Sequence, residues 1–174
     1  MTGTTAFTGL VLLIGLQRIS ELILSRRNLR WCQKHGGVEY GSGHYPFMVV
    51  LHTGLLAGAL LEVHLAHREI YPWLAWPMLA LVVASQWLRW WSIRSLGPSW
   101  NTRVIVVPGL RLVEDGPYRW FRHPNYLAVV VEGFALPLVG SAWITASVFT
   151  ALNIPLLAVR IRAEERALGM VSKY

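Results

Sequence analysis

The densest group of chemically capable side chains lies in residues 116–126, which read Gly-Pro-Tyr-Arg-Trp-Phe-Arg-His-Pro-Asn-Tyr. A second group, residues 160–166, holds three arginines and the adjacent carboxylates Glu164 and Glu165. Carboxylates accept hydrogen bonds from ribose hydroxyls or an ammonium group, and arginine pairs with a carboxylate. Together the two groups would suit a zwitterionic or polyhydroxy ligand. The alternative is that they are surface charges facing lipid headgroups, and spacing alone leaves both open.

The chain between the two groups must bring them together. Residues 125–139 and 143–159 are apolar and are separated only by Gly140-Ser141-Ala142, which predicts a tight helical hairpin. A hairpin returns the chain to its starting face, so we expect the two groups to meet. Pro124 would stand at the start of the first of these helices, where proline is tolerated. The free N–H groups there suit an anion.

The composition is that of a protein embedded in lipid. Of the 174 residues, 54% are hydrophobic and 14% are charged, against about a quarter charged in soluble domains. The mean hydropathy is +0.42. Disorder is excluded by the low polarity, and a disulfide scaffold by the single cysteine. The net charge of +7 does not indicate a nucleic-acid partner, because the cations lie in short stretches between long apolar runs.

Five apolar segments predict an all-α integral membrane protein with five transmembrane helices in a single domain, residues 1–174. The first three, about 5–24, 45–65 and 73–91, are each about 20 residues long, enough to cross a hydrocarbon core of about 30 Å. The third carries tryptophans at both ends, typical of an aromatic belt. The hairpin helices, about 125–139 and 143–159, are shorter and would thin the bilayer locally or stop short of one face.

Basic residues predict the orientation. Thirteen of the sixteen lie in three stretches, namely 25–44, 92–124 and the tail after Val159, whereas the turn at 67–71 holds only Arg68. By the positive-inside rule these three stretches are cytoplasmic and the N-terminus is outside. Five crossings satisfy all of them, which predicts a multi-pass protein of the inner or plasma membrane with its site on the cytoplasmic face.

The cytoplasmic stretch 92–124 differs from its surroundings. It contains three Gly/Pro pairs and the β-branched run Val104 to Val107, which predict turns and a small hairpin rather than a helix. A loop of this length in a compact protein is usually functional. We therefore expect a catalytic loop between the third and fourth helices.

Residues Arg122 to Tyr126, preceded by Gly116-Pro117-Tyr118 and followed by Glu164-Glu165, resemble the isoprenylcysteine carboxyl methyltransferase family. The resemblance is strong over Leu96 to Leu168. The first half, with residues 25–28 and 44–46, resembles the bacterial branch, whose members O-methylate alkylpyrone-type lipids. Sterol reductases and phospholipid N-methyltransferases carry sequences related to 122–126, and the paired glutamates make the resemblance more specific.

The resemblance implies a pocket for S-adenosylmethionine. No metal is expected, because His64 and His67 have no Cys or Asp nearby to complete a site. Carried over by position, the residues that line the cofactor are Tyr118, His123, Pro124 and Tyr126, and those that close the pocket are Glu164 and Glu165. Arginines of the two groups are candidates for holding the acceptor oxygen or the cofactor carboxylate: Arg119, Arg122 and Arg162.

Ionisable residues also occur inside the predicted helices. One polar stripe on the first helix contains Gln17, Arg18, Glu21 and Ser25, and one on the third contains Ser85, Arg89 and Ser92. Intramembrane charges are functional candidates by default, but arginine near a helix end can snorkel, so we favour a structural role. Glu132 has no partner on its own helix, which leaves an inter-helix hydrogen bond or a site role open.

The sequence thus predicts an S-adenosylmethionine-dependent O-methyltransferase whose acceptor arrives through the lipid. The acceptor would be an alkylpyrone- or alkylresorcinol-type lipid or a prenylcysteine carboxylate. An anionic acceptor needs little acid–base help, so positioning and desolvation would carry the rate. Two alternatives remain open: an NADPH-dependent membrane reductase of the sterol-reductase type, and a membrane scaffold without catalysis. The sequence leaves the oligomeric state open.

Overall fold

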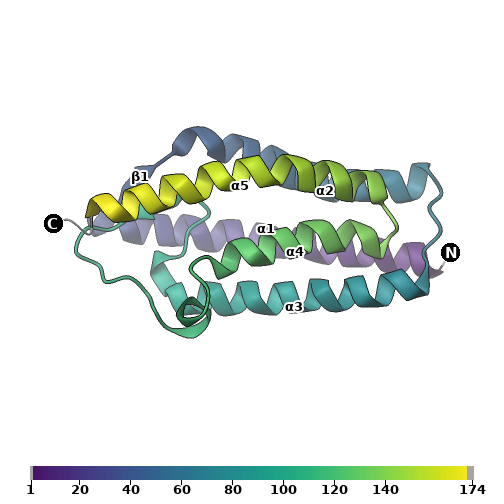
Figure 1. Ribbon diagram of the computed structural model, residues 1–174, viewed down its shortest axis with the longest axis horizontal. Helices are drawn as coiled ribbons and strands as arrows, with labels where there is room; N and C mark the ends of the chain where they lie inside the picture. Colours follow the sequence, from purple (N-terminus) through teal and green to yellow (C-terminus); the bar gives the residue numbers. More distant parts are fainter. Residues whose placement is uncertain (1, 172–174) are drawn as a thin grey trace.

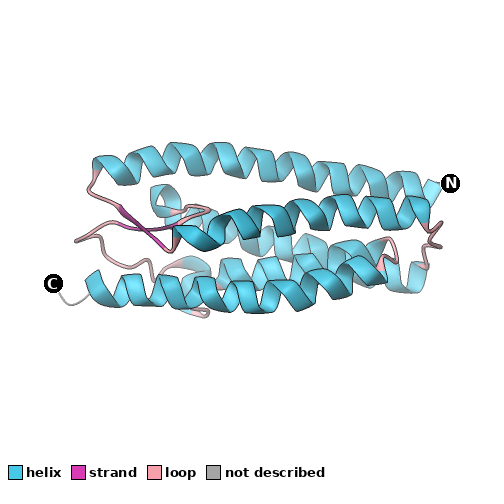
Figure 2. Ribbon diagram, turned by 90° about the horizontal axis from the view of Figure 1, so that it is seen from above, coloured by secondary structure: helices cyan, strands magenta, loops and turns pink. Residues whose placement is uncertain are grey.

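The computed structural model describes residues 2–171, and five α-helices account for most of them. The helices run alternately between the two ends of an elongated bundle (Figures 1 and 2), so that α4 and α5 form the predicted hairpin across Gly140-Ser141-Ala142. The bounds are α1 Thr2–Lys34, α2 Tyr45–Leu65, α3 Pro72–Leu96, α4 Pro124–Val139 and α5 Trp143–Val171. The predicted all-α architecture is confirmed.

By length and composition, three helical stretches among the described residues could cross a membrane: Gly3–Lys34, Ser42–Leu65 and Trp143–Gly169. Helix α4 is apolar but shorter. Large apolar side chains stand exposed on the outer faces of the bundle, among them Leu16 at 64%, Val50 at 71%, Val83 at 61% and Ile144 at 62%. Such an apolar exterior is stable only against lipid or a partner. The chain is an integral membrane protein, and five crossings stay a prediction.

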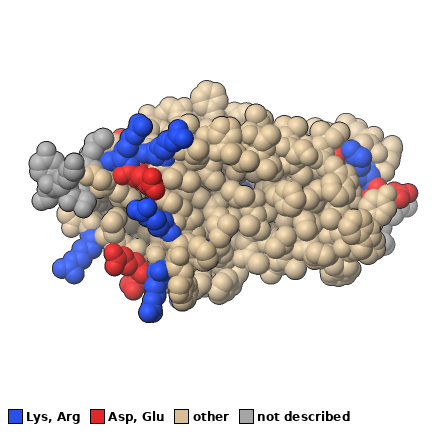
Figure 3. Space-filling view, in the orientation of Figure 1, with Lys and Arg blue, Asp and Glu red and all other residues tan. Residues whose placement is uncertain are grey.

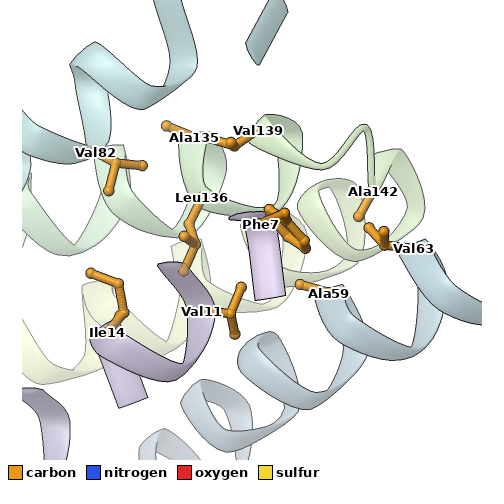
Figure 4. Close-up of a cluster of buried hydrophobic side chains, with 10 residues drawn as sticks. All are labelled: Phe7, Val11, Ile14, Ala59, Val63, Val82, Ala135, Leu136, Val139 and Ala142. Carbon is orange, nitrogen blue, oxygen red and sulfur yellow. The ribbon is translucent and has the colours of Figure 1, made fainter. Parts of the chain in front are cut away.

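A core of small and branched side chains holds the helices together. Figure 4 shows it between α1, α2, α3 and α4, and its buried members are Phe7, Val11, Ile14, Ala59, Val63, Val82, Ala135, Leu136, Val139 and Ala142. Between α4 and α5 the approach is closer still, because a Cβ on Gly133 would stand 1.9 Å from the Phe149 ring. Glycine at this position lets the hairpin helices pack side by side.

Three helices extend beyond the expected ends. Helix α1 continues ten residues past Leu24 to Lys34, where we predicted a loop from Ser25; α3 reaches Leu96, and α5 continues past Val159. Hydropathy marks where a helix is apolar, not where it stops. The added segments are rich in Arg and Leu and also contain Ala and Glu, which are good helix formers, so these helices continue with charged turns.

The β-branched run at Val104 also departs from expectation. It forms strand β2 (Val104–Val106), but this strand pairs antiparallel with the distant β1 (Val38–Tyr40), with Val38 opposite Val106, instead of forming a local hairpin. Ala167 of α5 packs against Val104 and Val106 in a second small core. The pair therefore ties the loop that follows α3 to the loop that follows α1, beside the last turns of α5.

Charged side chains gather at this end of the bundle. In Figure 3 most blue and red atoms lie around the ends of α1 and α5 and the start of α4, while the middle of the visible face is uncharged. The opposite end carries a small group with Arg68 and Glu62, whose carboxylate accepts hydrogen bonds from Ile144 N at 3.1 Å and Thr145 N at 2.8 Å and so caps α5. This distribution fits the predicted topology, and the orientation in the membrane stays a prediction.

Candidate functional site

A polar cavity lies where α3, α4, α5 and β2 meet at the charged end. Its lining comes from four separate parts of the chain: Leu96, Ser99, Trp100, Asn101, Arg103, Val104, Ile105, Val106, Tyr118, His123, Asn125, Tyr126, Arg160, Glu164 and Leu168. It holds ≈ 90 Å³, whereas pockets for drug-sized ligands hold about 300–1,000 Å³. The cavity is therefore smaller than a nucleoside-sized ligand needs.

The hydroxyl of Tyr126 joins the two chemically capable groups. Tyr126 lies in the first turn of α4, is 8% exposed, and donates a hydrogen bond to Glu164 of α5. Arg160 Nε donates to the same hydroxyl oxygen at 2.9 Å, and its guanidinium carbon stands 5.3 Å from the centroid of the Tyr126 ring. The hairpin thus brings the groups at 116–126 and 160–166 together, as its return predicts.

His123 and Glu165 form a second, more open link beside it. His123 Nε2 lies 3.3 Å from a Glu165 carboxylate oxygen, and the His123 ring stacks on that of Tyr126 with centroids 5.3 Å apart. His123 immediately precedes α4, and its carbonyl accepts the backbone N–H groups of Tyr126 and Leu127. Pro124 is the first residue of α4 and is fully buried, so it fixes the start of the helix without lining the cavity.

Tyr118 is placed by the short helical turn at Gly116–Arg119 (η3). Gly116 has φ +63°, and a Cβ there would stand 2.2 Å from Ser95 Oγ, so only glycine lets this turn pack on α3. Burial raises the pKa of the Tyr118 phenol, and the nearby Glu164 carboxylate raises it further. The phenol therefore stays neutral and can donate a hydrogen bond at physiological pH.

Three buried polar atoms of cavity-lining residues have no hydrogen-bond partner within the described chain. They are the Trp100 indole N–H, the Asn101 Oδ1 and the Asn125 Oδ1. Trp100 is only 3% exposed. Buried polar groups are nearly always paired, so one donor and two acceptors at a single cavity fit a polar ligand. Purine edges, ribose hydroxyls and the amino-acid end of S-adenosylmethionine offer the complementary groups.

Arg119, Arg122 and Arg162 lie outside this cavity. All three side chains are exposed, and none belongs to the lining. The cavity's buried arginine is Arg160, 6% exposed, which is not among the three arginines that the sequence indicates as candidates. Spacing could have identified it, because Arg160, Glu164 and Leu168 are four residues apart on one face of α5 and all three line the cavity.

A separate polar network lies farther inside the bundle and resolves the role of Glu132. Its carboxylate accepts hydrogen bonds from Arg18 of α1, from Arg89 Nη2 at 2.9 Å and from Gln86 Nε2 at 2.9 Å, both of α3. Arg18 also pairs with Glu21, as does Arg89 at 3.9 Å. Glu132 therefore makes inter-helix bonds. The charged members of the two predicted polar stripes, Arg18, Glu21 and Arg89, join its network, whereas the stripe serines bond elsewhere: Ser25 to Thr102, and Ser85 and Ser92 to carbonyls of their own helix.

Two arginines and two glutamates make this network neutral overall. Gln17 completes it by donating to Glu21 at 3.1 Å and to Gln86 at 2.8 Å. None of its members lines the cavity beside Tyr126. Charges buried in this way, paired within the protein, hold helices in register at the cost of their desolvation.

Comparisons with known proteins identify the family of the chain. The model of the isoprenylcysteine carboxyl methyltransferase family matches residues 78–170, which include most of α3, the loop, α4 and nearly all of α5. The uncharacterized protein YpbQ of Bacillus subtilis is 39% identical over 91% of this chain and 94% of its own length. An uncharacterized protein of Haemophilus influenzae is 25% identical over 87% of this chain and 88% of its own.

Proposed function

The chain belongs to the isoprenylcysteine carboxyl methyltransferase family, a family of membrane methyltransferases that use S-adenosylmethionine, and from this premise we propose its reaction and site. We propose that it transfers the methyl group of S-adenosylmethionine to an oxygen of a lipophilic, acidic acceptor. The observation that carries the proposal is the Arg160–Tyr126–Glu164 chain, which lies at the same cavity as three unpaired buried polar atoms. A cavity of this kind needs a polar ligand, and it opens at the end of an apolar bundle.

The residues of the cavity suit the different parts of the cofactor. Glu164 and Arg160 supply opposite charges for its ammonium and carboxylate groups. The Trp100 N–H and the two asparagine oxygens supply a donor and two acceptors for its purine and ribose. Tyr118, His123 and Tyr126 add aromatic surface, Glu165 holds His123, and Pro124 sets the start of α4. S-adenosylmethionine supplies an electrophilic methyl group on a sulfonium.

The protein's part in the reaction is then to position the reactants and exclude water. An enolate, phenolate or carboxylate acceptor is already nucleophilic, so no side chain has to remove a proton in the transition state. We propose that the exposed Arg119, Arg122 and Arg162 attract and hold the acceptor's anionic oxygen outside the cavity, because each lies within two residues of a residue that lines it.

The acceptor's tail explains why the site belongs to a membrane protein. Each buried methylene adds about 0.8 kcal/mol of preference for lipid, so a long-chain acceptor is concentrated in the bilayer and reaches the site sideways. We favour an alkylpyrone- or alkylresorcinol-type lipid over a prenylcysteine carboxylate, because the first half of the chain resembles the bacterial branch.

Methyl transfer by the purified protein tests this proposal. The protein is incubated with radiolabelled S-adenosylmethionine and either alkylpyrones of increasing chain length or a farnesylcysteine analogue. We expect label on oxygen of the alkylpyrones, rising with chain length. Equal activity on short, soluble pyrones would overturn lateral entry, and transfer only to the cysteine analogue would overturn the choice of acceptor.

We further propose that the site faces the cytoplasm and the N-terminus lies outside, because basic residues gather at the site's end of the bundle. Cysteine labels in intact cells test this. A label at residue 2 should react with an impermeant reagent, and one in the 107–115 loop should react only after permeabilisation. Reaction of both without permeabilisation would contradict the topology.

A further inference from the structure

On the outside of the bundle, α1 and α3 enclose a second hollow that none of the residues discussed for catalysis lines. Its lining consists of one stripe from each helix and the start of the following turn: Leu24, Arg27, Asn28 and Trp31 from α1, Trp90, Ile93 and Arg94 from α3, and Gly97 and Pro98. It holds ≈ 490 Å³, more than the cavity beside Tyr126. We call it the α1–α3 groove.

The groove is cationic and has no internal counter-charge. No acidic side chain belongs to its lining, and neither Arg27 nor Arg94 has an ion-pair partner among the described residues. Both arginine side chains are exposed, and the Arg94 guanidinium carbon stands 5.0 Å from the centroid of the Trp90 ring. Two unpaired guanidinium groups around one hollow favour an anion, and arginine is well shaped for phosphate oxygens.

The other lining residues of the groove are mostly apolar or aromatic and indicate the kind of molecule that carries the anion. Leu24 lies one turn before Arg27 on α1, and Ile93 directly precedes Arg94 on α3, so each helix brings both an apolar and a cationic side chain to the groove. Tryptophans occupy its two walls, and Trp90 is 56% exposed. Cations and tryptophans at the end of an apolar stretch are typical of headgroup depth.

We propose that the α1–α3 groove binds an anionic phospholipid, with the phosphate between Arg27 and Arg94 and the acyl chains along Leu24 and Ile93. A second copy of this chain fits less well, because a two-fold interface through the groove would place identical cationic stripes near each other. A soluble anion fits less well because it would leave the apolar half of the groove uncovered.

The α1–α3 groove shares a wall with the cavity beside Tyr126. The lipid proposal itself does not depend on the methyltransferase assignment. Gly97 and Pro98 line the groove, whereas Ser99 and Trp100 line the cavity. Asn28 braces the wall by donating to the carbonyls of Gly97 at 3.2 Å and Trp100 at 2.7 Å. A lipid in the groove would lie against the far side of the turn that carries Trp100.

Native mass spectrometry of the detergent-purified protein tests the proposal. The protein is titrated with dioleoyl phosphatidylglycerol and, separately, with dioleoyl phosphatidylcholine. We expect one phosphatidylglycerol to be retained more tightly than phosphatidylcholine. The double substitution Arg27→Gln and Arg94→Gln should weaken its binding about 30-fold, at about fivefold for each cation near the membrane surface.

The matched control is Arg26→Gln with Arg30→Gln, which removes the same charge from exposed positions of α1 outside the groove. We expect less than a twofold change there and retained binding in Arg27→Lys with Arg94→Lys. Equal weakening by the control pair would show only a diffuse charge effect and would overturn the site. Equal retention of the two lipids, displacement by inorganic phosphate alone, or a dimer that the groove variant dissociates would each overturn it as well.

Discussion

Two polar regions lie inside this apolar bundle, and they differ in how many of their buried polar atoms lack a hydrogen-bond partner. In the network around Glu132, two arginines and two glutamates cancel, and the only buried side-chain atom without a partner in the described part is Arg89 Nε. Among the residues that line the cavity beside Tyr126, the Trp100 N–H and two asparagine oxygens are unpaired. A network that is nearly fully paired holds helices together, whereas one with several unpaired atoms has bonding capacity left for a ligand.

The comparison teaches that charge inside a membrane protein is not by itself a sign of a site. The Glu132 network is the more highly charged of the two. Its charges are nevertheless used up between α1, α3 and α4. The cavity is identified by its unpaired buried polar atoms. The four predictions below separate residues that stabilise the fold from residues that bind the cofactor.

The largest effect is expected for Glu132→Gln. This change leaves Arg18 and Arg89 with one carboxylate, and breaking a buried ion pair costs about 3–5 kcal/mol of stability. Thermal unfolding in detergent should shift strongly downward, while the protein that remains folded still binds S-adenosylhomocysteine. Glu39→Gln is the control, because its pair with Arg103 at 3.0 Å is partly exposed and worth about 0–1 kcal/mol. Wild-type stability of Glu132→Gln would contradict the structural role.

Glu164→Gln should have the opposite effects, namely weaker cofactor binding with little change in stability. Losing a charge-assisted hydrogen bond costs about 1.5–3 kcal/mol, so the affinity for S-adenosylhomocysteine should fall roughly 10- to 150-fold with thermal stability near wild type. Isothermal titration calorimetry measures the affinity. Arg166→Gln, an exposed position two residues farther along α5, serves as the control. His123→Ala and Glu165→Gln should weaken binding in the same assay, and unchanged affinity in all three variants would refute the assigned cofactor residues.

Trp100→Phe should raise the stability of the free protein and lower its affinity for S-adenosylhomocysteine. Removing an unpaired buried donor relieves its desolvation cost, so the free protein should become slightly more stable. The lost ligand bond should lower the affinity for S-adenosylhomocysteine roughly 2- to 13-fold. Trp87→Phe controls for the change of ring, because Trp87 is 60% exposed on the outer face. A variant that is destabilised and binds normally would place Trp100 with the structural residues.

The smallest effect is expected for Arg122→Gln. Its side chain is exposed and outside the cavity, so we expect the affinity for S-adenosylhomocysteine to stay within twofold of wild type. The KM for an acidic acceptor should rise a few-fold, because an exposed charge contributes at most about 1 kcal/mol. Steady-state kinetics with both substrates varied provide the test. A large loss of cofactor affinity would instead move Arg122 into the cofactor site.

The parts of this molecule that depend on local chemistry could be predicted from the sequence. The starts of α2, α4 and α5 agree with the apolar segments to within a residue, and the hairpin at Gly140 brings Tyr126 to Glu164. The end of α1 could not be predicted from hydropathy, because its last ten residues are helical but charged. Hydropathy averages report lipid contact, not hydrogen bonding.

Features that depend on pairing between distant segments were missed. The sequence near Val104 does not predict that its partner strand is Val38–Tyr40. Both strands have only three residues, which is too short to give a recognisable pattern. Glu132 has no partner on its own helix, and its partners on α1 and α3 become evident only once the helices are packed. Arg160 was overlooked among the tail cations, although its spacing from Glu164 marks a shared helix face.

Ligand-induced thermal stabilisation of the detergent-purified protein tests the central claim most directly. At 100 times its Kd, a ligand that binds only the folded state adds about 2.7 kcal/mol of stability. S-adenosylhomocysteine should therefore raise the Tm of the wild type and do so far less for Glu164→Gln, whereas NADPH should leave both unchanged. Stabilisation by NADPH alone would favour a reductase, and no response to either ligand would favour a scaffold; both results would contradict the account.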